Sequence, residues 1–284
     1  MKTLFTRVTA LSLVCVGAML GTAQADEGIH AGVDLLFLSP KISETGIKNI
    51  FNYGNGALLD SDGNIGNELE FAQRVIIGYE GDQGGGIQVR WFTFDNLIDY
   101  TGREDRGGGW VNLSGLTRLD IDAFDAELTQ RGSFNVWDWV ATAGVRYGSI
   151  SLREDSVQEI DWEQFGDFAW SGSAGAEFQG AGPTVSVSGI REILWDGFSI
   201  FGAARTSLLY GDVEQFRYYS GRHKIDDETL QVWEIQAGVE LEREYDGFDL
   251  ILRTFWEAQR WDSESNMLGD VGLHGFGVHT GIEY

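Results

Sequence analysis

Arginine is the residue type whose placement most strongly suggests chemistry in this chain. Arginines recur in the middle of segments in which polar and apolar residues alternate. Charges in rings or ladders along a pore wall set ion selectivity, but the same charges could pair across a narrow interior and fill it. The pattern is compatible with both. The residues expected to line the interior are Arg74, Arg90, Glu127, Arg146, Arg205, Glu234, Arg253, Glu257 and Gln259.

Catalytic and metal-binding motifs are absent from the sequence. It contains no Gly-x-Ser-x-Gly, no His-Glu-x-x-His and no phosphate-binding glycine loop with a lysine. His274 and His279 have opposite parity, so one strand face cannot offer both to a metal. We expect His279 to form hydrogen bonds inside, although a histidine with a carboxylate at a rim could serve a hydrolase. The Asp-Ser-Asp-Gly-Asn sequence at 60–64 resembles the start of a calcium loop, but no glycine follows at the sixth position and no carboxylate at the twelfth, so a polar turn is expected. We expect no enzymatic activity, cofactor or metal.

The elements that position these side chains are β-strands. Trp139 and Val145 alternate with Thr142 and Arg146, and this period of two recurs to the end of the chain. Such alternation indicates strands with one apolar and one polar face. The expected strands are 28–39, 67–81, 85–97, 116–131, 135–150, 174–190, 197–211, 228–244, 247–262 and 269–284.

Two segments change phase midway. Leu119 and Ile121 give way to Phe124 and Leu128, and Phe178 gives way to residues 185 and 187 across a Gly-Ala-Gly-Pro sequence. A shift by one residue is what a β-bulge produces, and glycine and proline suit it. We therefore predict one bulge in each segment.

The connections alternate between short and long, which predicts antiparallel strands with all tight turns at one end. Outer-membrane barrels have this asymmetry, with an apolar outer face and a polar interior. Mid-strand charges, aromatics near strand ends and the final Tyr284 favour this polarity over that of a soluble barrel. The aromatics expected to face lipid and form interfacial girdles are Tyr79, Trp91, Trp139, Tyr147, Trp233, Trp256 and Tyr284.

The N-terminus has the features of a secretory signal peptide. Lys2 and Arg7 precede an apolar stretch over 8–20, and Ala-Gln-Ala at 23–25 fits a cleavage site. We expect residues 1–25 to be the signal peptide, cleaved after Ala25. The only cysteine, Cys15, lies within it, so residues 26–284 could form no disulfide or thiolate site.

The composition agrees with this organisation. The chain has 44 acidic against 20 basic residues and a formal charge of −24, which excludes nucleic acid as an expected partner. The mean hydropathy of −0.16 and the lack of a second long apolar run argue against membrane helices. The 10 Trp, 9 Tyr and 17 Phe are a heavy aromatic load that lipid-facing girdles would explain.

Four short stretches carry a family resemblance: AGVRY at 143–147, GAGPT at 180–184, FGAARTSLLYG at 201–211 and RTFWEAQRW at 253–261. In their order and spacing they resemble the Legionella-type major outer membrane protein family, a group of pore-forming β-barrels. The resemblance implies an outer-membrane barrel with a channel-like role. It brings no catalytic constellation.

We therefore expect residues 26–284 to form one all-β, up-and-down antiparallel transmembrane barrel of about ten strands, with short periplasmic turns and long outer loops. The leading hypothesis is a porin-like pore for ions or small solutes. The alternatives are a structural or adhesive barrel with a plugged lumen, and a soluble secreted barrel that binds a ligand inside. The expected partners are outer-membrane lipid, the permeating ions or solutes, and the outer-membrane assembly machinery, through the last strand ending at Tyr284.

Overall fold

The computed structural model describes residues 28–42, 68–81, 83–105, 109–162, 166–217, 221–263 and 270–284. The expected signal peptide and residues 60–64 lie outside this part of the chain. Within it, no helix is long and apolar enough to cross a membrane.

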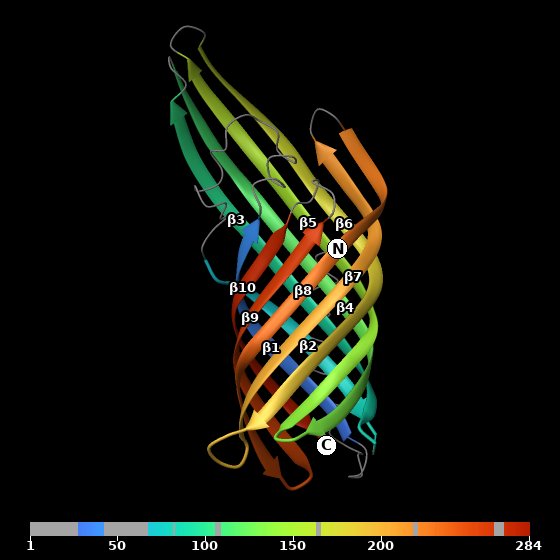
Figure 1. Cartoon of the computed structure of the whole chain (residues 1–284). Helices are drawn as coiled ribbons and strands as arrows, with labels where there is room; N and C mark the ends of the chain where they lie inside the picture. Colours follow the sequence, from blue (N-terminus) through green and yellow to red (C-terminus); the bar gives the residue numbers. More distant parts are fainter. Residues whose placement is uncertain are drawn as a thin grey trace.

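Ten antiparallel strands form a closed barrel, in which each strand pairs with its neighbours in the chain and β1 pairs with β10 (Figure 1). At the seam, Asp34 lies opposite His279, and the Tyr284 N–H donates to the Ile29 carbonyl at 3.0 Å. The strands are β1 Gly28–Ile42, β2 Glu70–Glu80, β3 Gly85–Asp105, β4 Gly109–Phe134, β5 Trp137–Trp162, β6 Gly166–Glu192, β7 Phe198–Arg217, β8 Gly221–Tyr245, β9 Phe248–Ser263 and β10 Val271–Glu283. The predicted fold class is confirmed.

The apolar strand faces point outward. Val145, Ile235 and Leu252 are 58%, 48% and 43% exposed, whereas Arg74 and Arg146 are each only 1% exposed. This polarity is the inverse of that in a soluble barrel and is the one that lipid requires. It is incompatible with the soluble ligand-binding alternative.

The two predicted bulges are wrong. The register of β4 with β3 and β5 runs without a shift, and β6 resumes the same register with β7 after Pro183. Leu119 and Ile121 are buried inside the barrel, while Phe124 and Leu128 are exposed outside it. The apparent phase change therefore arises because the interior changes from polar to apolar along the strand. The register irregularity that the structure has lies between Gly211 and Val213.

The strands on one side rise well beyond the rest of the barrel (Figure 1). β4, β5 and β6 have 26, 26 and 27 residues, whereas about 9–11 residues suffice to cross a bilayer. Much of the sequence expected as connections over 98–115, 151–173 and 211–227 is therefore paired strand. We call the part of β3–β6 farthest from the short turns the outer extension. Between Gly166 and Ser173, β6 pairs with β5 alone.

The outward face of β5 gives a test of the membrane position. Val145→Arg would place a cation among the lipid-facing side chains and should lower the free energy of unfolding in bilayers by about 2–4 kcal/mol. Denaturant titrations of the chain folded into lipid vesicles measure this. The matched control is Val157→Arg, because Val157 is 40% exposed on the same face of β5 but lies in the outer extension. An equal loss of stability for the two substitutions would contradict the placement of Val145 in the membrane and of Val157 outside it.

Candidate functional site

The structure places the nine residues predicted to line the interior on the inner face of the barrel. Seven are buried, Arg205 keeps 10% of its side chain exposed and Arg253 keeps 28%. Eight of the nine share one connected set of contacts, with Gln259 joined to it through Glu257. We call the connected charged residues and one histidine the charge cluster. Its members are Arg74, Arg90, Arg146, Arg205, Asp34, Asp125, Glu127, Glu234, Glu257 and His279. Arg253 lies apart, paired with Glu240 nearer the short turns.

Arg74 joins three strands. Its Nη1 donates to Asp34 Oδ2 at 2.7 Å, and its Nη2 donates to Glu257 Oε1 at 2.5 Å. These side chains point inward from β1, β2 and β9, and the closed barrel brings them together although they lie far apart in the sequence. A guanidinium suits this position because its planar array of donors can serve two carboxylates at once.

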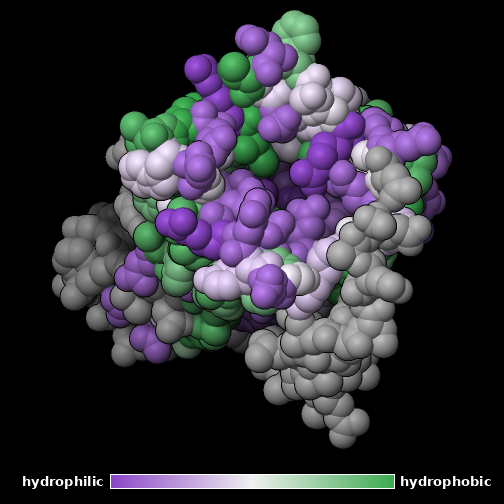
Figure 2. Space-filling model, turned by 90° about the horizontal axis from the view of Figure 1, so that it is seen from below, coloured by the Kyte–Doolittle hydropathy of each residue, from purple (hydrophilic) through white to green (hydrophobic). Residues whose placement is uncertain are grey.

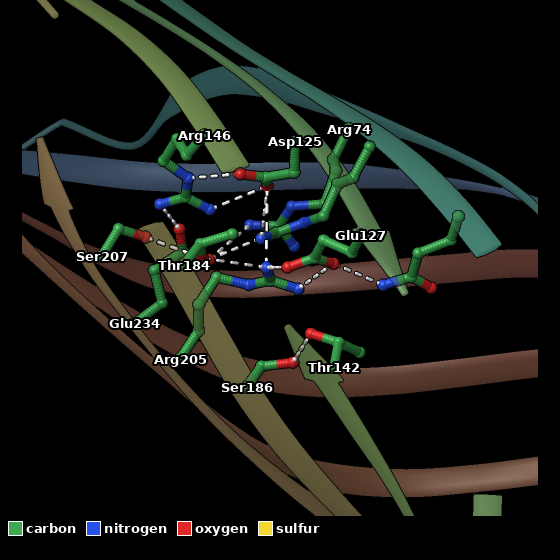
Figure 3. Close-up of polar contacts among 12 residues, drawn as sticks. Arg74, Asp125, Glu127, Thr142, Arg146, Thr184, Ser186, Arg205, Ser207 and Glu234 are labelled. Atoms are coloured by element: carbon green, nitrogen blue, oxygen red, sulfur yellow. Dashed lines mark hydrogen bonds and ion pairs between the residues drawn. The ribbon is translucent and has the colours of Figure 1, made fainter. Parts of the chain in front are cut away.

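Glu234 is the centre of the cluster. It accepts from Arg90 Nη2 at 2.5 Å and from Arg146 Nη1 at 2.6 Å, and Arg74 Nη2 lies 4.0 Å away. Arg146 also donates to Asp125, from Nε at 2.6 Å and from Nη2 at 2.9 Å. The close-up in Figure 3 follows this chain of contacts through the interior.

Arg205 extends the cluster to β7. It pairs with Glu127, which also accepts from Gln88 Nε2 at 2.6 Å, and its Nη1 lies 3.8 Å from Asp125 Oδ2. Thr184 lies beside it, accepting from Arg205 Nη1 at 3.4 Å and bonded to the Ser207 hydroxyl at 2.9 Å (Figure 3). Hydroxyl groups therefore complete the polar contacts on this wall.

Asp34 and Asp125 belong to the cluster but were not among the residues predicted for it. Each has the same parity as an inward residue on its strand, so the period of two could have identified both. With them, four arginines face five carboxylates (Asp34, Asp125, Glu127, Glu234 and Glu257). His279 Nδ1 lies 2.6 Å from Asp34 Oδ1, as expected for a hydrogen-bonding histidine inside.

An apolar layer fills the interior on the side of the cluster away from the short turns. On β4 it follows directly from Asp125, and on β5 it lies beyond Arg146. The Arg74 guanidinium lies 5.4 Å from the centre of the Phe92 ring, where cluster and layer meet. The layer consists of Leu36, Leu38, Ala72, Phe92, Phe94, Leu119, Ile121, Ala123, Ile150, Leu152, Ala176, Phe178, Leu209, Val213, Leu230, Val232, Trp261, Val271 and Leu273, none more than 3% exposed.

On the side of the short turns the interior is open and polar. Seen from below, hydrophilic residues surround a hollow at the centre of the barrel (Figure 2). Arg131, with 45% of its side chain exposed, lies 2.8 Å from Glu80 and 3.4 Å from Glu283 there. This polar mouth lies on the side of the cluster nearer the short turns, where the buried Phe201 and Phe255 rings also pack inside, 6.0 Å apart.

The seven aromatics expected in girdles all have the outward parity of their strands, but they lie at different distances from the short turns. Tyr79, Trp139 and Tyr284 are close to the short turns, and the others lie farther along their strands. Tyr147, Trp233 and Trp256 are 47%, 48% and 40% exposed, while the other four are half-buried. Their outward position suits contact with lipid, and their place in interfacial girdles stays a prediction. Among the described residues, no three potential ligands from His, Cys, Asp and Glu are placed to hold a metal.

Comparisons with known proteins give a family and one similar fold. A family model described as the Legionella pneumophila major outer membrane protein precursor matches residues 24–264. The outer-membrane protease OmpT of Escherichia coli matches with a TM-score of 0.52 and 13% identity, over 93% of this chain and 99% of that one, which supports the fold alone. The β domain of the Bordetella autotransporter BrkA matches over 91% of this chain and 99% of that one, at 15% identity and a TM-score of 0.32. No curated protein matches the chain.

Removing the central carboxylate tests the energetic role of the cluster. Glu234→Ala leaves the Arg90 and Arg146 guanidiniums short of a partner in a buried site, so the free energy of unfolding should fall by about 3–5 kcal/mol. Urea titration of the chain folded into vesicles measures the loss.

The control is Arg222→Ala, which removes a surface ion pair with Glu214 at 2.8 Å, where both side chains are exposed. Its cost should be no more than about 1 kcal/mol. If Glu234→Ala costs as little as this control, the cluster does not contribute to stability in the way described.

Proposed function

Because the chain belongs to the family of the Legionella pneumophila major outer membrane protein, we propose that it is an outer-membrane barrel with a closed lumen and a structural role. In this role the wall strengthens the membrane, and the outer extension presents a surface outside it. The proposal includes no catalytic step and no cofactor.

The observation that carries the proposal is the lack of exposed surface across two successive levels of the interior. In the charge cluster, Glu257 is 0% and Arg146 is 1% exposed. In the apolar layer beyond it, Ile121 and Leu230 are both 0% exposed. Water reaching the cluster from the polar mouth would have to displace paired charges and then enter a packed apolar region, and both steps are unfavourable.

A porin-like pore for ions or small solutes is the second candidate. The polar mouth favours it, because a hydrophilic hollow at one end is the entrance that a pore needs (Figure 2). Arg253, part-exposed near this mouth, and the arginines of the cluster would then set selectivity by charge. Apolar constrictions are known as gates in channels, so the apolar layer would be the gate.

Export and assembly form part of the same proposal. Removal of residues 1–25 after Ala25 would release a chain whose last strand ends at Tyr284. The N–H of Tyr284 is already bonded to Ile29, and its ring lies 5.9 Å from that of Phe248. A terminal strand docked in this way supports its use as the segment that the assembly machinery recognises.

Single-channel recording in planar lipid bilayers separates the two candidates. A closed barrel should give no conductance above the bilayer baseline, whereas a porin reconstituted in parallel gives steady steps. Heat-modifiable migration in gels verifies folding of each sample.

The matched variant is Arg253→Glu. In a pore, reversing this charge near the mouth should shift the reversal potential in a salt gradient toward cation preference. In a closed barrel it should leave the trace silent. Steady conductance of the unmodified chain, changed in selectivity by this variant, would overturn the closed-lumen proposal in favour of the pore.

A further inference from the structure

Two of the short turns carry large apolar side chains that the barrel itself does not cover. Phe134 and Val136 at the β4–β5 turn are 78% and 51% exposed. Leu194 and Trp195 at the β6–β7 turn are 79% and 56% exposed. Because β5 pairs with β6 as far as Asp138 and Ile190, these two turns are neighbours at the end of the barrel. We call these four residues the apolar tip.

The backbone of the β6–β7 turn holds Leu194 in its exposed position. The Trp195 N–H donates to the Ile193 carbonyl and the Phe198 N–H to the Trp195 carbonyl, at 2.8 and 3.0 Å. Leu194 has a φ of 67°, in the left-handed region that is uncommon for a bulky residue. If this turn only faced water, glycine or asparagine at position 194 would adopt the same backbone conformation at a lower energetic cost.

The β8–β9 turn differs in chemistry. Its exposed tip is Asp246 and Gly247, flanked on the outer face by Tyr245, 54% exposed, and by Phe248, whose ring stacks on that of Tyr245 at 5.2 Å. The Asp246 carboxylate would be repelled by anionic headgroups and would be costly to take out of water. The β6–β7 turn also has one exposed carboxylate, Asp196, but its tip carries Leu194 and Trp195 beside it, whereas the tip of the β8–β9 turn carries no large apolar side chain.

The apolar tip is continuous with the lipid-facing wall. On β6, Val185 and Val187 are 49% and 52% exposed on the outer face that leads to the tip. Beside the tip, the Arg191 guanidinium lies 6.0 Å from the centre of the Trp137 ring. An indole with a neighbouring arginine is a combination suited to the membrane interface, where the ring reaches the acyl boundary and the cation meets phosphates.

We infer that the apolar tip inserts into the headgroup and acyl boundary of the periplasmic leaflet, so that the β4–β7 side of the barrel sits deeper in the membrane than the β8–β9 side. The occupant of this surface is phospholipid. The consequence is a tilted barrel whose turns on one side are membrane anchors, while those on the other side remain in water.

Fluorescent labels at the two kinds of turn test this inference. Leu194→Cys and Asp246→Cys are made in a Cys15→Ala background, so that each chain has one thiol, and both are labelled with NBD. The chains are folded into vesicles of phosphatidylethanolamine and phosphatidylglycerol. At position 194 the emission should shift to the blue, resist aqueous iodide and be quenched by lipids with a nitroxide on the acyl chain. At position 246 iodide should quench, and the nitroxide lipid should not.

Because Leu194→Cys alters a constrained turn, Val136→Cys provides a second label on the apolar tip, and heat-modifiable migration verifies folding of every sample. The vesicles contain lipid alone, so no protein partner can protect the labels. Iodide quenching at positions 194 and 136 equal to that at 246 would overturn the inference. Protection from iodide at all three positions would also overturn it, since the barrel would then not be tilted.

Discussion

The whole structure depends on the requirement that every backbone N–H and C=O in the hydrocarbon of a membrane has a partner within the protein. A closed ring of antiparallel strands meets it, and pairing of β1 with β10 removes the last open edge at membrane depth. Once the ring is closed, the period of two sends alternate side chains outward and inward. The outward set must then suit lipid, and the inward set must fill a narrow lumen.

The inward side chains fill the narrow lumen in two different ways along its length. In the charge cluster, guanidiniums and carboxylates neutralise one another, with Glu234 shared between Arg90 and Arg146. Beyond it, aliphatic and aromatic side chains pack as in a soluble core. Buried ion pairs contribute little net stability compared with apolar packing, but leaving one partner alone is costly. The cluster therefore fixes which side chains face one another, while the apolar layer fills the interior beyond it.

The period of two was sufficient to predict the strands, their antiparallel order and the inward position of Arg74, Arg146 and Glu257. It failed where it was interpreted as meaning polar inside and apolar outside along a whole strand. On β4 the inward Leu119 then appeared to be a break in register, because the sequence shows which face a residue is on but not the height at which an interior changes character.

The outer extension was underestimated for a different reason. Residues 166–173, Gly-Asp-Phe-Ala-Trp-Ser-Gly-Ser, are rich in the small and polar residues of loops, yet they pair with β5 along their length. Long-range pairing overrides such weak local preferences. The individual contacts of the charge cluster could not be predicted either. The parity of a residue shows that its side chain faces the interior, but it does not show which other inward side chains lie within contact distance.

The contacts of the charge cluster also set an order of assembly. Arg74 and Glu257 are separated by 183 positions in the chain, and Asp34 and His279 by 245. Neither pair can form until the last strands have docked beside the first, so Asp34 and Arg74, which can pair with each other across β1 and β2, gain their remaining partners only when β9 and β10 are in place. Closure of the barrel therefore completes the charge cluster, because its last contacts join the two ends of the chain.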